Sequence, residues 1–217
     1  MTGTKGMTAV ILAAGSSSRM GRFKPLLELG GTTIVERVVS LFRGAGILDI
    51  RVVAGHGSEV LERVLRRLDV QVMVNERYED GMFSSVLRAL RDMGPGTGAV
   101  FILPVDIPLV STGTMQYLVM RHCQDPARIL IPSYHGRRGH PVVIPGMYLD
   151  AVRAWSGERG LRGALEMFSS ETVEVSVEDR NILFDLDTPA DYEECLRRWS
   201  AMSQEDGRIH VMEVPGT

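Results

Sequence analysis

Residues 9–27 of this chain read AVILAAGSSSRMGRFKPLL. The first part, Ala9–Leu12, is a short apolar run of the kind that forms a strand buried on both faces of a sheet. Small residues follow it, and after them come the cations Arg19, Arg22 and Lys24. In an open parallel sheet, ligands bind beyond the carboxyl ends of the strands. The stretch therefore predicts a buried first strand with a ligand-binding loop directly after it.

The loop after this expected strand has the composition of a phosphate-binding loop. Gly15 and Gly21 permit tight turns, and the small side chains at positions 13–18 let backbone N–H groups approach a ligand. Arg19 and Lys24 supply the positive charge that suits phosphate oxygens. The motifs Gly-x-x-x-x-Gly-Lys-Ser/Thr and Gly-x-Gly-x-x-Gly are absent from the sequence. A solvated basic loop is the alternative, but the combination of glycines, small residues and spaced cations favours phosphate.

Apolar, β-branched runs recur along the chain and alternate with segments of helical period. We expect strands at residues 9–12, 51–54, 71–74, 99–103, 129–131, 141–144, 172–177 and 182–186. Apolar faces of helical spacing lie within residues 34–42, 60–68 and 86–90. This alternation predicts a three-layer α/β/α fold around a mainly parallel, twisted sheet. After about residue 125 Gly and Pro cluster, and we expect an inserted or antiparallel section over the sheet there.

Length and composition favour one domain. With 217 residues, of which 44% are hydrophobic, the chain can bury one substantial core. We expect a single domain over residues 8–200. Residues 1–7 are expected to form a mobile N-terminus, and residues 201–217 a polar tail.

Charge and hydropathy disfavour several classes of protein. The formal net charge is −3, whereas a nucleic-acid-binding protein usually carries a basic stripe. No apolar stretch approaches the roughly 20 residues of a membrane helix, and the N-terminus lacks the apolar core of a signal peptide. Cys123 and Cys195 form no Cys-x-x-Cys pair, which favours reduced thiols with structural roles. We therefore expect a cytoplasmic protein without nucleic-acid or membrane partners.

Carboxylates follow two of the later apolar runs. Asp106 stands between Pro104 and Pro108 directly after an expected strand, which suits a rigidly held Mg²⁺ ligand. An aspartate that caps the next turn is the alternative. Asp185 and Asp187 are two positions apart, so on a strand they would share one face.

The residues after Asp187 have the pattern of a helix start. Thr188 suits the cap, Pro189 the first helical position, and Asp191 the third position of a capping box. This local role accounts for these three residues and leaves Asp185 and Asp187 without a structural explanation.

Two further stretches combine glycine with polar side chains. The stretch GMFSS places Gly81, Ser84 and Ser85 at the start of an expected helix, where serine commonly serves as a cap. The stretch HGRRGHPVVI contains Arg138 and His140, which suit an anionic ligand and equally a solvated hairpin turn.

The opening loop resembles a known fingerprint. Residues 12–24 are similar to Leu-Ala-x-Gly-x-Ser-x-Arg-Met-Gly-x-x-Lys of the nucleotidyltransferases typified by the molybdenum-cofactor guanylyl- and cytidylyltransferases. The resemblance extends over roughly residues 7–199 and implies a Rossmann-like fold of the nucleotide-diphospho-sugar transferase type. It implies that the loop wraps a nucleoside triphosphate, with catalytic contacts from Arg19 and Lys24 to the phosphates. The other nucleotide-binding residues that it implies in this loop are Leu12, Ala13, Ala14 and Gly15.

One position in this loop separates the branches of the family. Guanylyl members more often carry glycine where this chain has Ala14. The resemblance is therefore closer to the cytidylyl branch.

The same resemblance gives roles to the carboxylates. The family binds its catalytic magnesium at Pro-x-Asp-x-Pro, which implies that Asp106 is both a catalytic residue and a metal ligand. A family segment Asp-x-Asp-Thr-Pro or Asn-x-Asn-Thr-Pro completes the metal site, and it matches Asp187 and, less directly, Asp185.

The two glycine-containing stretches also have counterparts in the family. Cytidylyl-type enzymes line the nucleotide pocket with a Gly-Met-x-Ser-Ser stretch, which implies nucleotide contacts from Gly81, Ser84 and Ser85. Phe83 departs from the small residue usual there, so the resemblance does not define the exact shape of the base pocket. A Gly-x-Pro segment lies beside the acceptor in the family, which implies acceptor contacts from Gly139, His140 and Pro141. Together with the cation Arg138 of the same stretch, these are the expected acceptor-binding residues.

These expectations predict a Mg²⁺-dependent enzyme that transfers CMP from CTP, or nucleotide from another NTP, to a molybdopterin-type acceptor and releases pyrophosphate. A molybdoenzyme of the xanthine dehydrogenase type would be the partner. The nearer alternative is a guanylyltransferase or another nucleotidyltransferase for small phosphates. A non-catalytic chaperone that delivers the molybdenum cofactor is disfavoured by Asp106, because a carrier needs no magnesium ligand. A nicotinamide-dependent oxidoreductase is disfavoured by the missing dinucleotide fingerprint.

Overall fold

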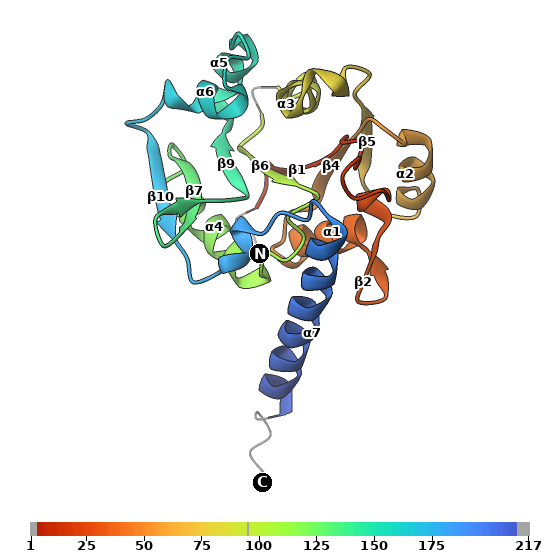
Figure 1. Cartoon of the computed structure of the whole chain (residues 1–217). Coiled ribbons are helices and arrows are strands. Elements are labelled where there is room, and N and C mark those ends of the chain that lie inside the picture. Colours follow the sequence, from red (N-terminus) through yellow and green to blue (C-terminus); the bar gives the residue numbers. More distant parts are fainter. Residues whose placement is uncertain (1–3, 95, 212–217) are drawn as a thin grey trace.

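The computed structural model describes residues 4–94 and 96–211 (Figure 1). The strands are β1 Met7–Ala13, β2 Glu28–Leu29, β3 Thr32–Thr33, β4 Asp49–Ala54, β5 Gln71–Val74, β6 Ala99–Pro104, β7 Ile129–Tyr134, β8 Arg137–Arg138, β9 Val142–Pro145 and β10 Thr172–Ser176. The α-helices are α1 Ile34–Gly44, α2 Ser58–Leu65, α3 Met82–Leu90, α4 Thr112–Gln124, α5 Leu149–Ala154, α6 Gly160–Glu166 and α7 Pro189–Val211. Short 3-10 turns are η1 Lys24–Leu26, η2 Tyr78–Asp80, η3 Gly146–Tyr148 and η4 Arg180–Leu183.

The first strand lies at the centre of the main sheet, whose order is β10-β7-β9-β6-β1-β4-β5, with β8 paired to β7. β1 pairs in parallel with β4 on one side and with β6 on the other, and β5 continues the parallel part. Each parallel neighbour requires a crossover, which explains why helices separate these strands in the sequence. The expected α/β fold with a mainly parallel sheet is confirmed.

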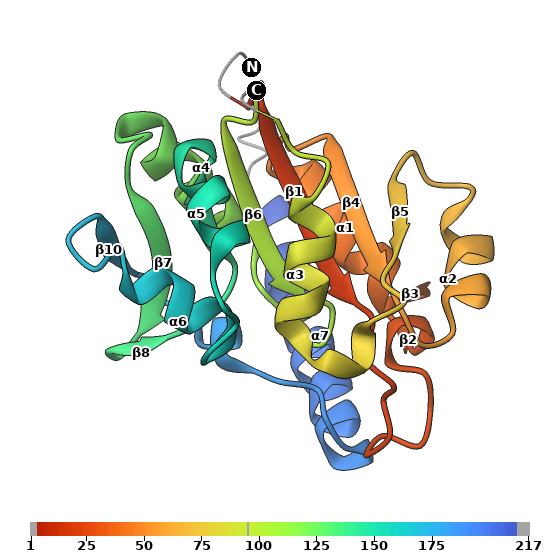
Figure 2. The same cartoon turned by 90° about the horizontal axis from the view of Figure 1, so that it is seen from above.

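Helices cover both faces of this sheet, and each face has its own apolar core. Along β1, Ala9 and Ile11 pack into the core beneath α1, α2, α4 and α7, whereas Val10 and Leu12 pack beneath α3, α5 and α6. Figure 2 shows α3, α5 and α6 in front of the sheet, with α7 behind it. Because successive strand residues point to opposite faces, a strand between two layers must be apolar at every position, and all seven residues of β1 are buried.

The chain after residue 125 departs from the expected arrangement. β9 runs antiparallel between β6 and β7, and β10 runs parallel to β7 at the edge. The section is therefore antiparallel in part, as expected, but it belongs to the sheet rather than lying over it.

The prediction of a strand at residues 182–186 is wrong. The structure has η4 there, followed by an extended segment held by two backbone hydrogen bonds: His140 N to Ile182 O (3.1 Å) and Leu186 N to Asp106 O (2.9 Å). Ile182 and Leu186 are fully buried. The apolar run at residues 182–186 is thus explained by the burial of its side chains, although the segment does not form the hydrogen-bond ladder of a strand.

Regular structure also crosses the expected domain boundaries. Met7 already belongs to β1, and α7 continues past residue 200 to Val211, so that it extends beyond the body of the molecule in Figure 1. Residues 1–3 and 212–217, within the expected terminal segments, lie outside the described residues. Among the residues that the structure describes, no helix combines the length and hydropathy needed to cross a membrane.

A capping box begins α1. Glu36 N donates to Thr33 Oγ1 (3.4 Å), and Thr33 N donates to Glu36 Oε2 (2.8 Å). Burial alone would raise the pKa of Glu36, but hydrogen bonds from Thr33 and the charge of Arg67 bring this pKa below its ordinary value. A carboxyl whose pKa is lower in the folded state stabilises the fold above its unfolded pKa, and the contribution is lost as the pH falls through the folded pKa.

We expect Thr33→Ala to lower the free energy of unfolding by about 1 kcal/mol at pH 7, the usual cost of a lost cap. The deficit shrinks at a pH below the folded pKa of Glu36, because the wild-type protein has then lost its ionised Glu36 as well. Urea denaturation at both pH values measures this. Thr32→Ala is the control, since its hydroxyl donates only to Leu29 O (3.3 Å). Equal deficits at the two pH values would contradict the assignment.

Candidate active site

The loop after β1 is organised around one serine. Ser17 adopts a left-handed conformation (φ 56°), and its carbonyl accepts hydrogen bonds from Met20 N (3.1 Å) and Gly21 N (3.2 Å). Its hydroxyl accepts from Lys24 N (3.1 Å). Gly21 also has a positive φ (67°), which a glycine adopts without strain. Ser17 therefore shapes the loop and places Lys24 at its end.

A cavity of about 750 Å³ opens at the carboxyl ends of β1 and β6. Its walls come from the loop, from the start of α3, from the turn after β6 and from the segment before α7. The sequence-predicted residues that line it are Leu12, Ala13, Ala14, Gly15, Arg19, Lys24, Gly81, Ser85, Asp106 and Asp187. Residues distant in the sequence thus share one cavity, as the meeting of parallel strand ends at one sheet edge requires.

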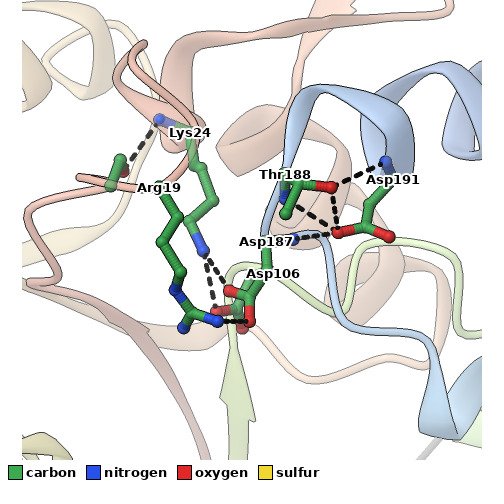
Figure 3. A network of polar contacts seen from close by, with 7 residues as sticks. Arg19, Lys24, Asp106, Asp187, Thr188 and Asp191 are labelled. Carbon is green, nitrogen blue, oxygen red and sulfur yellow. Dashed lines mark hydrogen bonds and ion pairs between the residues drawn. The ribbon is translucent and has the colours of Figure 1, made fainter.

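Charged side chains of opposite sign meet in this cavity (Figure 3). Lys24 Nζ lies 2.8 Å from Asp187 Oδ1 and 3.5 Å from Asp106 Oδ2. Arg19 Nη1 lies 2.8 Å from Asp187 Oδ2. The Lys24 side chain is only 13% exposed, whereas that of Arg19 is 72% exposed. The hydrogen bond from Lys24 is the largest cause that holds the pKa of Asp187 below its ordinary value, so this carboxylate is ionised at neutral pH.

Backbone hydrogen bonds fix the two carboxylates relative to each other. Leu186 N donates to the carbonyl of Asp106 (2.9 Å), which ties the segment before α7 to the turn after β6. Thr188 N and Oγ1 donate to Asp191 Oδ2 (both 2.8 Å), and Asp191 N donates to Thr188 Oγ1 (3.3 Å). The capping box expected at the start of α7 is confirmed, and it holds Asp187 two residues before Pro189, the first residue of the helix.

Asp185 lies differently from Asp187. The segment is not a strand, so the reason for placing both carboxyls on one face does not hold. Asp185 is absent from the residues that line the cavity. Asp185 is exposed at the surface, and partial desolvation, followed by the charges of Asp106 and Asp187, raises the pKa of its carboxyl above its ordinary value.

The donor set of the cavity suits one kind of metal. Within residues 4–94 and 96–211, no group of three or more His, Cys, Asp or Glu side chains is arranged to hold a metal ion. Three acidic residues line the cavity, and two of them, Asp106 and Asp187, pair with Lys24, whereas the third, Glu79, comes from η2. Magnesium is commonly held by one or two carboxylates together with water and substrate phosphates, so the residues present fit Mg²⁺ in company with a nucleotide.

Ser84 and Ser85 have different surroundings. Asn75 Nδ2 donates to both hydroxyl oxygens, at 2.9 Å for Ser84 and 3.0 Å for Ser85. Of the two serines, Ser85 lines the first cavity, whereas Ser84 borders a separate hollow beside Arg88. Neither serine caps α3, whose cap residue is Gly81. The structure thus brings Ser85 to the candidate site and turns Ser84 away from it.

A second cavity of about 830 Å³ adjoins the first, and Gly81 and Met82 line both. This cavity lies between α3, α6 and the main sheet. Apolar side chains form most of its walls, and several charged side chains lie among them. The lining residues include Asp80, Phe83, Val86, Ile131, Arg138, Gly139, His140, Val142, Arg159, Leu161, Arg162, Leu165 and Glu166. The expected acceptor residue Pro141 is buried and is not part of this lining.

Local geometry explains the residues of this second wall. A side chain at Gly139 would collide with the carbonyl of Ile182, so only glycine fits. Burial lowers the pKa of His140, against smaller opposing effects of Ile102 and Asp106, which keeps the imidazole neutral at pH 7. Arg159 Nη1 and Arg162 Nε lie 2.6 and 3.6 Å from the carboxylate of Glu166. Two arginines therefore share one acidic partner there.

Comparison with known proteins assigns a family. Residues 9–175 match the MobA-like NTP transferase domain. This chain belongs to that family. The resemblance found in the sequence is thereby confirmed.

Curated relatives of this MobA-like NTP transferase carry different names. The molybdenum cofactor cytidylyltransferase of Escherichia coli is 27% identical over 191 residues, which are 88% of this chain and 96% of the relative. The nicotine blue oxidoreductase of Paenarthrobacter nicotinovorans is 31% identical over 72% of this chain and 79% of the relative. The bifunctional protein GlmU of Syntrophomonas wolfei is 31% identical over 60% of this chain, which spans only 31% of that longer protein.

A solved structure shares the fold of this MobA-like NTP transferase. The crystal structure of Rv0371c from Mycobacterium tuberculosis has a TM-score of 0.78 at 25% identity. The match covers 91% of this chain and 100% of that one.

Two residues that organise the site in this MobA-like NTP transferase were missed by the sequence analysis. The sequence could have indicated Ser17, because this residue matches the serine of the family fingerprint. Asn75 had only its place directly after an expected strand, where ligand-binding side chains gather in parallel sheets.

Proposed function

We propose that this MobA-like NTP transferase moves CMP from CTP to the phosphate of molybdopterin and releases pyrophosphate. The observation that carries the proposal is the meeting of the loop cations Arg19 and Lys24 with Asp106 and Asp187 in one cavity. The E. coli cytidylyltransferase, which is similar over most of its length, and Ala14 in the loop support CTP and molybdopterin as substrates.

The chain's own residues would position and neutralise the triphosphate. Asp106 and Asp187 would hold Mg²⁺, which when bound supplies positive charge to the phosphate oxygens. Lys24 and Arg19, which pair with these carboxylates in the structure, would turn to the phosphates and stabilise the charge of the departing pyrophosphate. Backbone N–H groups of residues 13–18 would complete this cradle. Such a transfer depends on alignment and charge rather than on a covalent intermediate.

The second cavity would receive the acceptor. Its apolar wall of Phe83, Val86 and Ile131 suits a flat heterocycle such as a pterin, and Arg138 at its edge suits an anionic group. Because Gly81 and Met82 border both cavities, an acceptor placed there can direct its phosphate toward the nucleotide. The product would be consumed in the cytoplasm by a molybdoenzyme of the xanthine dehydrogenase type.

Nucleotide selectivity tests the proposal. With Mg²⁺ and molybdopterin, we expect pyrophosphate release to be fastest with CTP, by about tenfold or more over GTP, ATP and UTP. Release that is fastest with GTP would replace the cytidylyl assignment with a guanylyl one. Tight molybdopterin binding without release for any nucleotide would favour the carrier, and oxidation of NADH or NADPH with a quinone-like dye would favour the oxidoreductase.

A further inference from the structure

Asn75 is a buried polar residue at the carboxyl end of β5, and every polar atom of its side chain has a partner. Its Oδ1 accepts from Arg77 N (3.0 Å), and its Nδ2 donates to Ser84 Oγ and Ser85 Oγ. A backbone N–H can only donate, so the amide oxygen must face Arg77 and the amide nitrogen must face the serines. The orientation of the Asn75 amide is therefore fixed by the backbone.

This orientation determines where the hydroxyl hydrogens of the two serines point. Both serine oxygens accept from Asn75, so each hydroxyl hydrogen must be donated elsewhere. Ser84 Oγ has acceptors within 2.8 Å, the carbonyls of Arg77 and Gly81. For Ser85 the described part of the chain offers no such acceptor, and its side chain borders the nucleotide cavity at 3% exposure. Ser85 thus presents a hydrogen-bond donor to the cavity.

The wall that carries Ser85 lacks the charges that phosphates need. Arg19, Lys24, Asp106 and Asp187 come from the β1 loop, the turn after β6 and the segment before α7. With the triphosphate among these groups, the neutral wall made by α3 is left for the nucleoside. A single donor there recognises an acceptor atom.

We propose that Asn75 is a positioning residue that fixes Ser85 as a hydrogen-bond donor, so that the α3 wall recognises an acceptor on the base, such as O2 of a pyrimidine. This inference rests on the proposed nucleotide site and states which group of the nucleotide that site recognises. Asn75 acts through Ser85 and touches no reacting atom.

The test compares binding of CTP with binding of inorganic tripolyphosphate, both with Mg²⁺, by isothermal titration calorimetry. Ser85→Ala is expected to weaken CTP binding about tenfold, the loss of one hydrogen bond, and to leave tripolyphosphate binding unchanged. Ser84→Ala is the matched control, because it removes the other partner of Asn75 outside the cavity. This control is expected to bind both ligands as the wild type does.

Asn75→Asp reverses the polarity without changing the size of the side chain. In this variant a carboxylate oxygen replaces Nδ2 and accepts the hydroxyl hydrogen of Ser85. The lone pairs of Ser85 Oγ then face the base. We expect CTP binding to fall about 100-fold, since an acceptor meets an acceptor, while tripolyphosphate binding persists. If Asn75→Asp also loses tripolyphosphate because the site is distorted, Ser85→Ala alone decides.

Wild-type CTP affinity in Ser85→Ala overturns the inference, as do equal losses in Ser84→Ala and Ser85→Ala. Failure of the proposed function appears differently. In that case no pyrophosphate is released with molybdopterin, although the difference in CTP binding between wild type and Ser85→Ala persists.

Discussion

Asp106→Asn lowers the turnover of nucleotidyl transfer by on the order of 1,000-fold while the fold persists. The amide keeps the size of the side chain but removes the negative charge that would hold Mg²⁺ beside Lys24 and Asp187. The backbone carbonyl of residue 106, which accepts from Leu186 N, is unaffected by the substitution. Pyrophosphate release under saturating CTP measures the loss, and circular dichroism with thermal unfolding checks the fold.

Asp185→Asn is the comparison for this result. Asp185 lies two residues before Asp187, yet it does not line the cavity that contains both loop cations. We expect it to lose much less turnover than Asp106→Asn. If the order of the two effects were reversed, the metal-binding carboxylate would have to be assigned to Asp185 instead.

Lys24→Ala is expected to lower turnover by on the order of 100- to 1,000-fold. Its ammonium is the largely buried cation between Asp106 and Asp187, and the remaining cation, Arg19, is mostly exposed and screened by water. The variant also loses the hydrogen bond that is the largest cause of the low pKa of Asp187. NMR titration of this carboxyl should therefore show a higher pKa in the variant.

The acid stability of the protein gives a second readout for Lys24. Because the pKa of Asp187 is lower in the folded state, this carboxylate stabilises the fold above its unfolded pKa of about 3.9, and the contribution disappears as the pH falls further. Lys24→Ala should flatten this part of the stability profile. Arg22→Ala is the control, since its guanidinium lies over the Tyr192 ring, 5.8 Å from the centroid. If Lys24→Ala and Arg22→Ala lowered turnover equally, the positive charge of the loop alone would explain the loss, and the specific role of Lys24 would be contradicted.

The meeting of the loop cations with Asp106 in the candidate site could be predicted from the sequence because a simple rule governs it. Parallel strands end at one edge, so the loop after β1 and Asp106 after β6 must lie close together. The capping box of Thr188 and Asp191 could also be predicted, since it needs only two residues three positions apart in the sequence.

Other features depend on contacts that no local pattern encodes. The apolar run at residues 182–186 has the period of a strand, but neighbouring segments determine whether a ladder forms, and here only single hydrogen bonds do. Ser84 and Ser85 are alike in the sequence, yet adjacent residues on a helix point about 100° apart and meet different surroundings. The role of Asn75 arises only because β5 ends beside the start of α3.

The reversed direction of β9 has a consequence for how substrate preference can diverge. Ile102 of β6 pairs with Val142 of β9, so the chain enters β9 at the same edge where it leaves β6. The hairpin tip at residues 135–136, between β7 and β8, lies outside this pairing. Insertions or deletions at the tip would therefore leave the register of β1, β4 and β6 intact. Evolution can therefore change the proposed acceptor side at this tip, while the strands that carry Arg19, Lys24 and Asp106 keep their register.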